Sequence, residues 1–115
     1  MDEGKLFCPV EKALAVINGK WKPYIFRHLI DRTKRFGELQ RALPQVTRKI
    51  LTQQLRELED DGVLIRTVFP QVPPKVEYSL SDYGRTLIPI IDSLSGWGQT
   101  HVERNNYDGA KQPNG

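Results

Sequence analysis

The first part of the chain has apolar residues at helical spacing. Residues 9–17 are predicted to form a short helix whose apolar face contains Val10, Ala13, Leu14 and Ile17. Pro9 suits the first helical position, where its missing N–H is not needed, and Asn18-Gly19 ends the helix.

Two further short helices follow. For residues 22–31 the predicted apolar face contains Trp21, Tyr24, Ile25 and Leu29. For residues 36–43 the predicted inward side chains are Phe36, Leu39 and Leu43. Pro44 ends the third helix because it cannot donate a helical hydrogen bond.

A fourth helix is predicted from about 47 to 61. Thr47 is a good N-cap, and Gly62 can adopt the left-handed conformation that commonly ends a helix. The apolar side chains Leu51, Leu55 and Leu58 share one side of this helix.

The periodicity then changes from helical spacing to alternation. Residues 63–68 and 76–80 alternate as strands do, and the proline-rich "PQVPP" between them is unsuited to a strand interior. These residues predict a two-stranded hairpin with a stiff tip. Ser81 should cap one last long helix, in which Pro89 causes a kink or marks the first turns.

The order of elements predicts a mainly helical α+β fold. We expect a single domain over residues 1–104, and a tail, residues 105–115, without an apolar face and without fixed structure. The length of 115 residues suits one modest core, and 38% hydrophobic with 27% charged residues is typical of a soluble protein.

The composition also excludes several classes of protein. No apolar run is long enough to span a membrane, and the acidic residues near the start do not suit a signal peptide, so we expect a cytoplasmic protein. Cys8 is the single cysteine, and His28 and His101 lie far apart, so neither a disulfide framework, a metal site nor a cofactor is expected. No nucleophile with a neighbouring base and no phosphate loop is found, which argues against an enzyme.

Charge is unevenly distributed along the chain. The net charge is only +3, but residues 31–56 contain seven Lys or Arg against Asp31 and Glu38. Residues 57–61, "ELEDD", then contain four acids. A basic segment of this kind indicates a polyanionic partner, although a solvated charged surface would look similar.

The fourth helix suggests what that partner is. Opposite its leucines the helical spacing gathers Arg48, Lys49, Thr52, Gln53 and Arg56, with no acid among them. Arg, Lys, Gln and Thr can contact base edges or phosphates, and a solvated helix more often mixes both signs of charge. Two short helices joined by a turn, with such residues on the second, predict a helix-turn-helix that binds double-stranded DNA in the major groove.

Other residues are expected to support this contact. The hairpin, about residues 65–80, directly follows the recognition helix and has the position of a wing. Arg66 and Lys75 on it, and Lys34 and Arg35 before the third helix, could reach flanking phosphates or the minor groove. Thr47, at the start of the recognition helix, completes the predicted DNA-binding set.

The chain resembles the HxlR-type winged helix-turn-helix transcriptional regulators of the MarR-like group. The resemblance covers residues 8–101, through "CPVEKAL", "GKWK", "RFGELQRALP", "KILTQQLRELEDDG", "PPKVEYSL" and "WG", with Asn18 where a second glycine is usual. It implies a homodimer held by the terminal helices that binds a roughly palindromic operator. The apolar stripe of the last helix fits such an interface, with Leu87, Ile91, Leu94 and Trp97 as the predicted contacts.

Three questions stay open from the sequence. In some members of this family a cysteine matching Cys8 senses oxidants or electrophiles, but a small packed residue at the helix start is the stronger interpretation of Cys8 from the sequence. A small-molecule effector could bind near the terminal helices. The alternative function is a winged helix that contacts proteins and binds no specific DNA.

Overall fold

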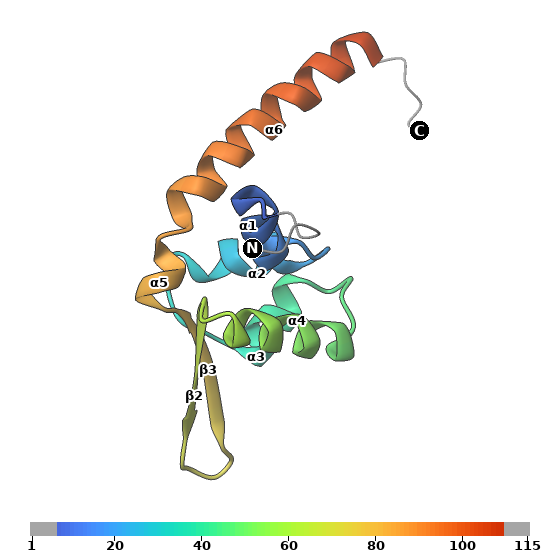
Figure 1. Ribbon diagram of the computed structural model, residues 1–115. Helices are drawn as coiled ribbons and strands as arrows, with labels where there is room; N and C mark the ends of the chain where they lie inside the picture. The colour runs from blue at the N-terminus through green and yellow to red at the C-terminus, as the bar shows by residue number, and fades with distance from the viewer. Residues whose placement is uncertain (1–6, 110–115) are drawn as a thin grey trace. The chain divides into compact units, whose positions relative to one another are not determined.

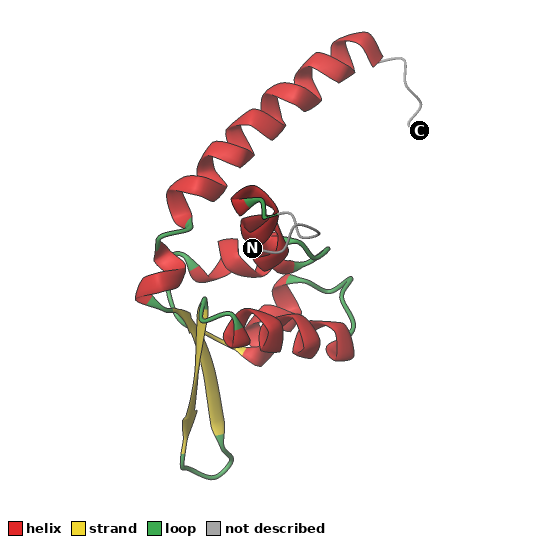
Figure 2. Cartoon of the chain, in the orientation of Figure 1, coloured by secondary structure: helices red, strands yellow, loops and turns green. Residues whose placement is uncertain are grey.

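The computed structural model describes residues 7–109, and the side chains of residues 7–105. The chain divides into two compact units, residues 1–85 and residues 86–115, which are described in turn. Figure 2 shows that helices dominate and that the hairpin contains the long strands. The predicted mainly helical winged fold is therefore confirmed.

Four helices precede the hairpin in the first unit (Figure 1): α1 (Pro9–Ile17), α2 (Lys22–Leu29), α3 (Phe36–Ala42) and α4 (Arg48–Asp60). The apolar faces of α2, α3 and α4, together with Val63, form most of the core, whose largest fully buried side chains are Ile25, Phe26, Leu29, Leu39, Leu51, Leu55, Leu58 and Val63. The predicted inward positions of α3 and α4 are thus confirmed for Leu39, Leu43 and the leucines of α4.

Helix α1 forms as predicted, but its apolar face is not in the core. It has no buried residue, and Val10 and Leu14 are 65% and 45% exposed. Asn18 ends the helix with φ −82° and ψ 108°, an extended conformation that needs no glycine. The departure from the usual second glycine therefore has no structural consequence here.

The ends of α4 follow the local signals in the sequence. Thr47 is the N-cap, and its Oγ1 accepts a hydrogen bond of 3.1 Å from the Ile50 N–H. At the other end Gly62 has φ +79°, which favours glycine because a Cβ would be strained there. Both predicted boundaries are confirmed.

The sheet has one strand more than predicted. It contains β1 (Lys34–Arg35), β2 (Leu64–Phe69) and β3 (Lys75–Leu80), in the antiparallel order β1-β3-β2. Lys34 pairs with Tyr78, which also pairs with Arg66. A two-residue strand is too short to show alternation, which is why the sequence predicted only the hairpin.

The helix expected after Ser81 is broken into two. A short α5 (Asp82–Arg85) closes the first unit, and α6 (Ile88–Gly109) lies in the second. Pro89 explains the break, because in a continuous helix its ring would clash with the carbonyl of Arg85. Ser81 therefore caps α5, where its Oγ accepts a 2.8 Å hydrogen bond from the Gly84 N–H.

Helix α6 extends beyond the predicted end of the ordered domain. It reaches Gly109, into the segment 105–115 expected to lack fixed structure, and residues 110–115 lie outside the described part. Local contacts support the extension: Asn105 Nδ2 is 2.9 Å from His101 Nε2, one turn earlier. None of the helices in the described part of the chain combines the length and hydropathy that a membrane span requires.

Candidate nucleic-acid interface

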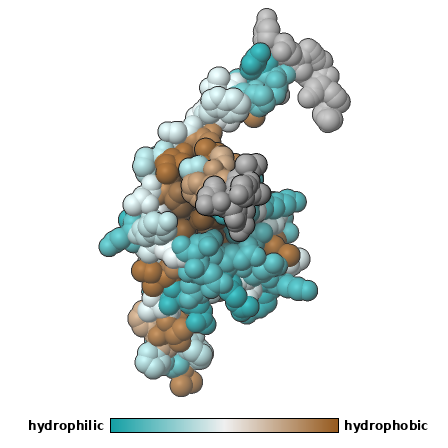
Figure 3. Space-filling model, viewed as in Figure 1, coloured by the Kyte–Doolittle hydropathy of each residue, from teal (hydrophilic) through white to brown (hydrophobic). Residues whose placement is uncertain are grey.

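The exposed side of α4 is a continuous polar surface. One open depression is lined by Arg48, Lys49, Thr52, Gln53 and Arg56, all of them exposed. The structure thus brings together the five residues that helical spacing had placed on one face. Figure 3 shows that the surface in this part of the molecule is mostly hydrophilic. Thr47 is exposed at the edge of this face, but its hydroxyl is engaged in capping.

Arg48 is held against the preceding helix. Its guanidinium carbon lies 4.7 Å from the centre of the Phe36 ring, at the start of α3. A guanidinium stacked on an aromatic face keeps its N–H donors free at the edges. Sequence reasoning had placed Phe36 inward, whereas the structure leaves it half-buried under Arg48.

A hydrogen-bonded chain connects Gln53 to the interior. Gln53 Nε2 donates to Glu57 Oε2 at 3.3 Å, and Glu57 Oε1 is 2.7 Å from the ammonium of Lys22. The Lys22 side chain is only 5% exposed. The hydrogen bond and positive charge of Lys22 lower the pKa of Glu57 below its ordinary value. Sequence reasoning missed Lys22 and Glu57, because nothing local signals a contact between residues so far apart.

Arg66 extends the polar surface from α4 onto the wing. It is exposed on β2, and it lines a second depression together with Thr52, Arg56, Glu59 and Tyr78. Thr52 and Arg56 therefore belong to both depressions. The predicted wing residue Arg66 and the predicted recognition helix share one surface.

Lys75 and Arg35 meet at another place. Both line a third depression, between the start of α3 and the start of β3 next to the tip of the wing, with Phe36, Gly37, Pro74 and Val76. The ammonium of Lys75 is 3.4 Å from Glu77 Oε2 and 4.4 Å from the centre of the Phe69 ring. Lys75 is therefore half-buried and already partly neutralised, unlike Lys49.

Among the predicted DNA-contacting lysines, Lys34 has the most buried side chain. Its ammonium donates to the backbone carbonyl of His28 and is 3.4 Å from Asp31 Oδ1. The Lys34 side chain is only 14% exposed. These contacts assign it to fixing the connection between α2 and α3.

The tip of the wing is apolar and exposed. Val72 is 98% exposed and Val68 49%, and the hydrophobic colour at the end of the hairpin is visible in Figure 3. No basic residue lies within "PQVPP", residues 70–74. The positive charge of the wing therefore lies on its strands, at Arg66 in β2 and at Lys75, which directly follows the tip.

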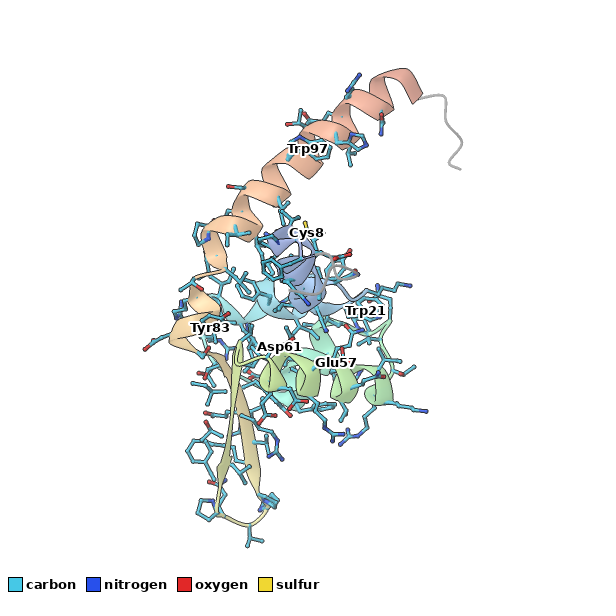
Figure 4. The ribbon with its side chains drawn as sticks, in the orientation of Figure 1. Cys8, Trp21, Glu57, Asp61, Tyr83 and Trp97 are labelled. Carbon is cyan, nitrogen blue, oxygen red and sulfur yellow. The ribbon has the colours of Figure 1, made fainter. Side chains whose placement is uncertain are left out.

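The remaining predicted site residues lie at the two ends of the chain. Cys8 is the N-cap of α1, exposed and without a side-chain capping bond (Figure 4). Leu87 lies in the turn before α6 and is half-buried. On α6, Ile91 is 8% exposed, and Leu94 and Trp97 are 49% and 69% exposed. The ring of Trp97 stacks on His101 with centroids 5.1 Å apart. Within residues 7–109 no three His, Cys, Asp or Glu residues are placed to hold a metal ion.

Comparison with known proteins identifies close relatives. The model of the HxlR-like helix-turn-helix family matches residues 16–106. The HTH-type transcriptional regulator YtcD of Bacillus subtilis is 55% identical over 104 residues, which cover 90% of this chain and 82% of that protein. The solved structure of ytcD superposes with a TM-score of 0.80 at 56% identity, covering 84% and 99% of the two chains.

Two further solved relatives are described as redox-responsive or oxidant-treated. The redox regulator HypR in its oxidized form is 56% identical, with a TM-score of 0.75 and coverage of 81% of this chain and 96% of that one. The diamide-treated YodB from B. subtilis is 31% identical, with a TM-score of 0.72 and coverage of 84% and 96%.

Proposed function

The chain belongs to the HxlR-like helix-turn-helix family of DNA-binding transcriptional regulators, and we propose that it binds a roughly palindromic operator as a homodimer. In this proposal α4 enters the major groove and the wing follows the flanking backbone or minor groove. The observation that carries it is the exposed face of α4, which presents only hydrogen-bond donors and donor–acceptor groups between Arg48 and Arg56.

The side chains on this face suit two roles, contact with base edges and contact with phosphates. Arg48 can contact guanine and Gln53 can contact adenine through paired hydrogen bonds, and Thr52 can meet a thymine methyl group. Lys49, Arg56 and the wing residue Arg66 suit phosphates, and they would fix affinity and register. Supporting evidence is that Arg66 and Arg56 line the same depression.

The dimer is supported by the apolar residues of α6. Leu94 and Trp97 lie one turn apart and are 49% and 69% exposed, which is unusual for large apolar side chains at helical spacing. A second copy of the chain would cover them and would place two recognition helices on successive turns of the duplex. Of the other two predicted contacts, Leu87 lies in the turn before α6 and is half-buried, and Ile91 is only 8% exposed, so a second copy would cover little further surface at Ile91.

The first experiment selects bound duplexes from a randomised pool and titrates the winner by fluorescence anisotropy at near-physiological salt. A palindromic winner preferred over a scrambled duplex by about a thousandfold or more supports the proposal. If no sequence is enriched and the weak binding disappears with salt, the chain is instead a winged helix for protein contacts.

A second experiment tests the dimer by sedimentation. Leu94→Glu places a charge in the proposed interface and should produce monomers that bind the operator weakly. Ser93→Glu introduces the same residue at the neighbouring exposed position and should remain dimeric. If both variants stay dimeric with unchanged operator affinity, α6 is not the interface through Leu94.

We further propose that Cys8 makes DNA binding sensitive to oxidants. The support is its exposed thiol at the start of α1 and the similarity to the redox regulator HypR. Diamide removes two hydrogen atoms as two thiols join in a disulfide, which here must link two subunits or one subunit and a small thiol, because the chain has one cysteine. Diamide should change operator affinity in the wild type and not in Cys8→Ser. Equal responses would exclude Cys8 as the sensor.

A further inference from the structure

We propose that the ion pair between Lys22 and Glu57 sets the orientation of the Gln53 side chain for base recognition. This inference rests on the proposed function, because it assigns Lys22 and Glu57 as positioning residues for the DNA contact of α4. Neither residue lines the depression on α4: Lys22 is buried, and the Glu57 side chain is 45% exposed beside Gln53. They act through Gln53.

The geometry is a relay from the interior to the surface. Lys22 Nζ is 2.7 Å from Glu57 Oε1, and the second oxygen of the same carboxylate accepts the 3.3 Å hydrogen bond from Gln53 Nε2. The carboxylate thus has one oxygen for each partner. Gln53 and Glu57 are four residues apart, the spacing at which side chains of one helix meet.

The inner end of the relay is rigid. The Lys22 side chain is 5% exposed, and its stem passes so close to Gly19 that a Cβ there would lie 3.0 Å from the Lys22 Cδ. The neighbouring Trp21 N–H donates a 3.1 Å hydrogen bond to Gln54 Oε1 on α4. Figure 4 shows Trp21 and Glu57 on facing segments, the α1–α2 junction and α4. Two contacts therefore join this junction to α4.

The outer end of the relay is the Gln53 side chain, whose orientation determines which hydrogen-bonding groups face the DNA. A glutamine amide has a donor side and an acceptor side, and pairing with adenine requires both in the correct order. The Glu57 carboxylate can only accept hydrogen bonds, so it binds the NH2 group of the Gln53 amide. The flipped amide, with its oxygen toward Glu57, is therefore unfavourable. An amide already fixed in one orientation loses less conformational entropy when it binds.

Glu57→Gln tests this with little change in shape. The new amide oxygen can still accept from Lys22, but the group then facing Gln53 is a donor, which no longer accepts from Gln53 Nε2. The matched control is Asp60→Asn, which removes the same charge at an exposed position of the same helix. Both variants should bind all duplexes somewhat more tightly, because each removes one negative charge near the phosphates.

The first readout needs no DNA. In NMR spectra of the full chain, the side-chain amide of Gln53 should have distinct shifts and restricted motion in the wild type and in Asp60→Asn. In Glu57→Gln these signals should become those of a mobile side chain, and Lys22→Met should give a partial effect. Identical Gln53 spectra in all four proteins would overturn the inference without affecting the proposed function.

The second readout is base discrimination. Gln53→Ala first identifies the operator base pair that Gln53 contacts. It is the pair whose replacement lowers the affinity of the wild type but not that of Gln53→Ala. At that pair, Glu57→Gln should lower discrimination by about 2- to 10-fold, the range expected for losing one pre-ordered side chain, and Asp60→Asn should not. Unchanged discrimination in Glu57→Gln overturns the inference and leaves the operator proposal standing. If the wild type enriches no operator sequence, the proposed function itself is wrong. The NMR comparison still tests whether Glu57 orients Gln53.

Discussion

The guanidinium carbon of Arg48 lies 4.7 Å from the centre of the Phe36 ring, so the first residue of α4 is stacked on the first residue of α3. The two helices of the helix-turn-helix are thus joined at the end that would approach DNA. An arginine stacked in this way is restricted in rotation while its donors remain available. We therefore expect Phe36 to support the proposed DNA contact of Arg48.

Replacing Phe36 should weaken operator binding through Arg48. We expect Phe36→Leu to reduce operator affinity by about 2- to 5-fold, which corresponds to the roughly 0.5–1 kcal/mol of an exposed cation–π contact. Anisotropy titration measures this, and Phe36→Tyr, which keeps an aromatic ring, is the control. If leucine and tyrosine give the same affinity as phenylalanine, the stacking does not prepare Arg48 for binding.

Base readout and phosphate contact should be separable on α4. Gln53→Ala should lose about 1–3 kcal/mol of discrimination at one base pair while binding scrambled duplexes almost as before. Lys49→Ala should weaken all duplexes similarly and reduce the slope of log affinity against log salt by about 1. Equal losses on operator and scrambled duplexes for both variants would mean that Gln53 reads no base.

Lys75 is expected to matter less than Lys49. It is half-buried, with its ammonium near both the Glu77 carboxylate and the Phe69 ring. A phosphate contact would have to compete with these neighbours. Lys75→Ala should therefore change the salt slope by less than Lys49→Ala, and a larger change would show that Lys75 leaves Glu77 when DNA binds.

Gly84 should be intolerant of any side chain. A Cβ at this position would lie 2.2 Å from the carbonyl oxygen of Val63, which also accepts a 2.9 Å hydrogen bond from the Ser81 N–H. Because the obstacle is backbone, it cannot rotate away. We expect Gly84→Ala to lower the free energy of unfolding by about 1–3 kcal/mol, as overpacking does.

Urea unfolding monitored by circular dichroism measures this loss. The control is Gly37→Ala in α3, where a Cβ would meet only the flexible end of Arg41, at 3.4 Å. That variant should be neutral or slightly stabilising, since alanine favours helix over glycine. A Gly84→Ala protein as stable as Gly37→Ala would mean that α5 can move away from Val63.

The sequence predicted those features that depend on neighbours along the chain. The helical core positions of α3 and α4, the Thr47 cap and the left-handed Gly62 were all correct, because periodicity and capping are local. At Pro89 the structure differs from the prediction, because the helix is fully broken between Arg85 and Ile88. The sequence alone predicts only a kink or the first turns of one long helix at this proline.

Contacts between distant residues could not be predicted in the same way. Gln53 and Gln54 are adjacent and chemically identical, yet one is exposed beside Glu57 and the other accepts from the backbone of Trp21. Lys34 looked like another exposed cation until β1 placed it beside the His28 carbonyl. In each case the deciding partner lies on another element, and only the packed fold brings the two together.

The ion pair between Lys22 and Glu57 gives a last prediction, for stability at acid pH. The pKa of Glu57 is below its ordinary value of 4.5 in the folded state, because Lys22 donates a hydrogen bond to the carboxylate and attracts its charge. A carboxyl group with a lowered folded pKa stabilises the fold above its unfolded pKa. That stabilisation is lost as the pH falls through the folded pKa.

We therefore expect the wild type to exceed Glu57→Gln in stability at neutral pH, and the difference to shrink as the pH falls below 4.5. Urea unfolding at a series of pH values from neutral to acid measures the two curves. Asp60→Asn is the control for loss of an exposed carboxylate from α4, and its curve should run closer to that of the wild type. A gap between wild type and Glu57→Gln that stays constant down to strongly acid pH would show that protonation of Glu57 does not break its contact with Lys22.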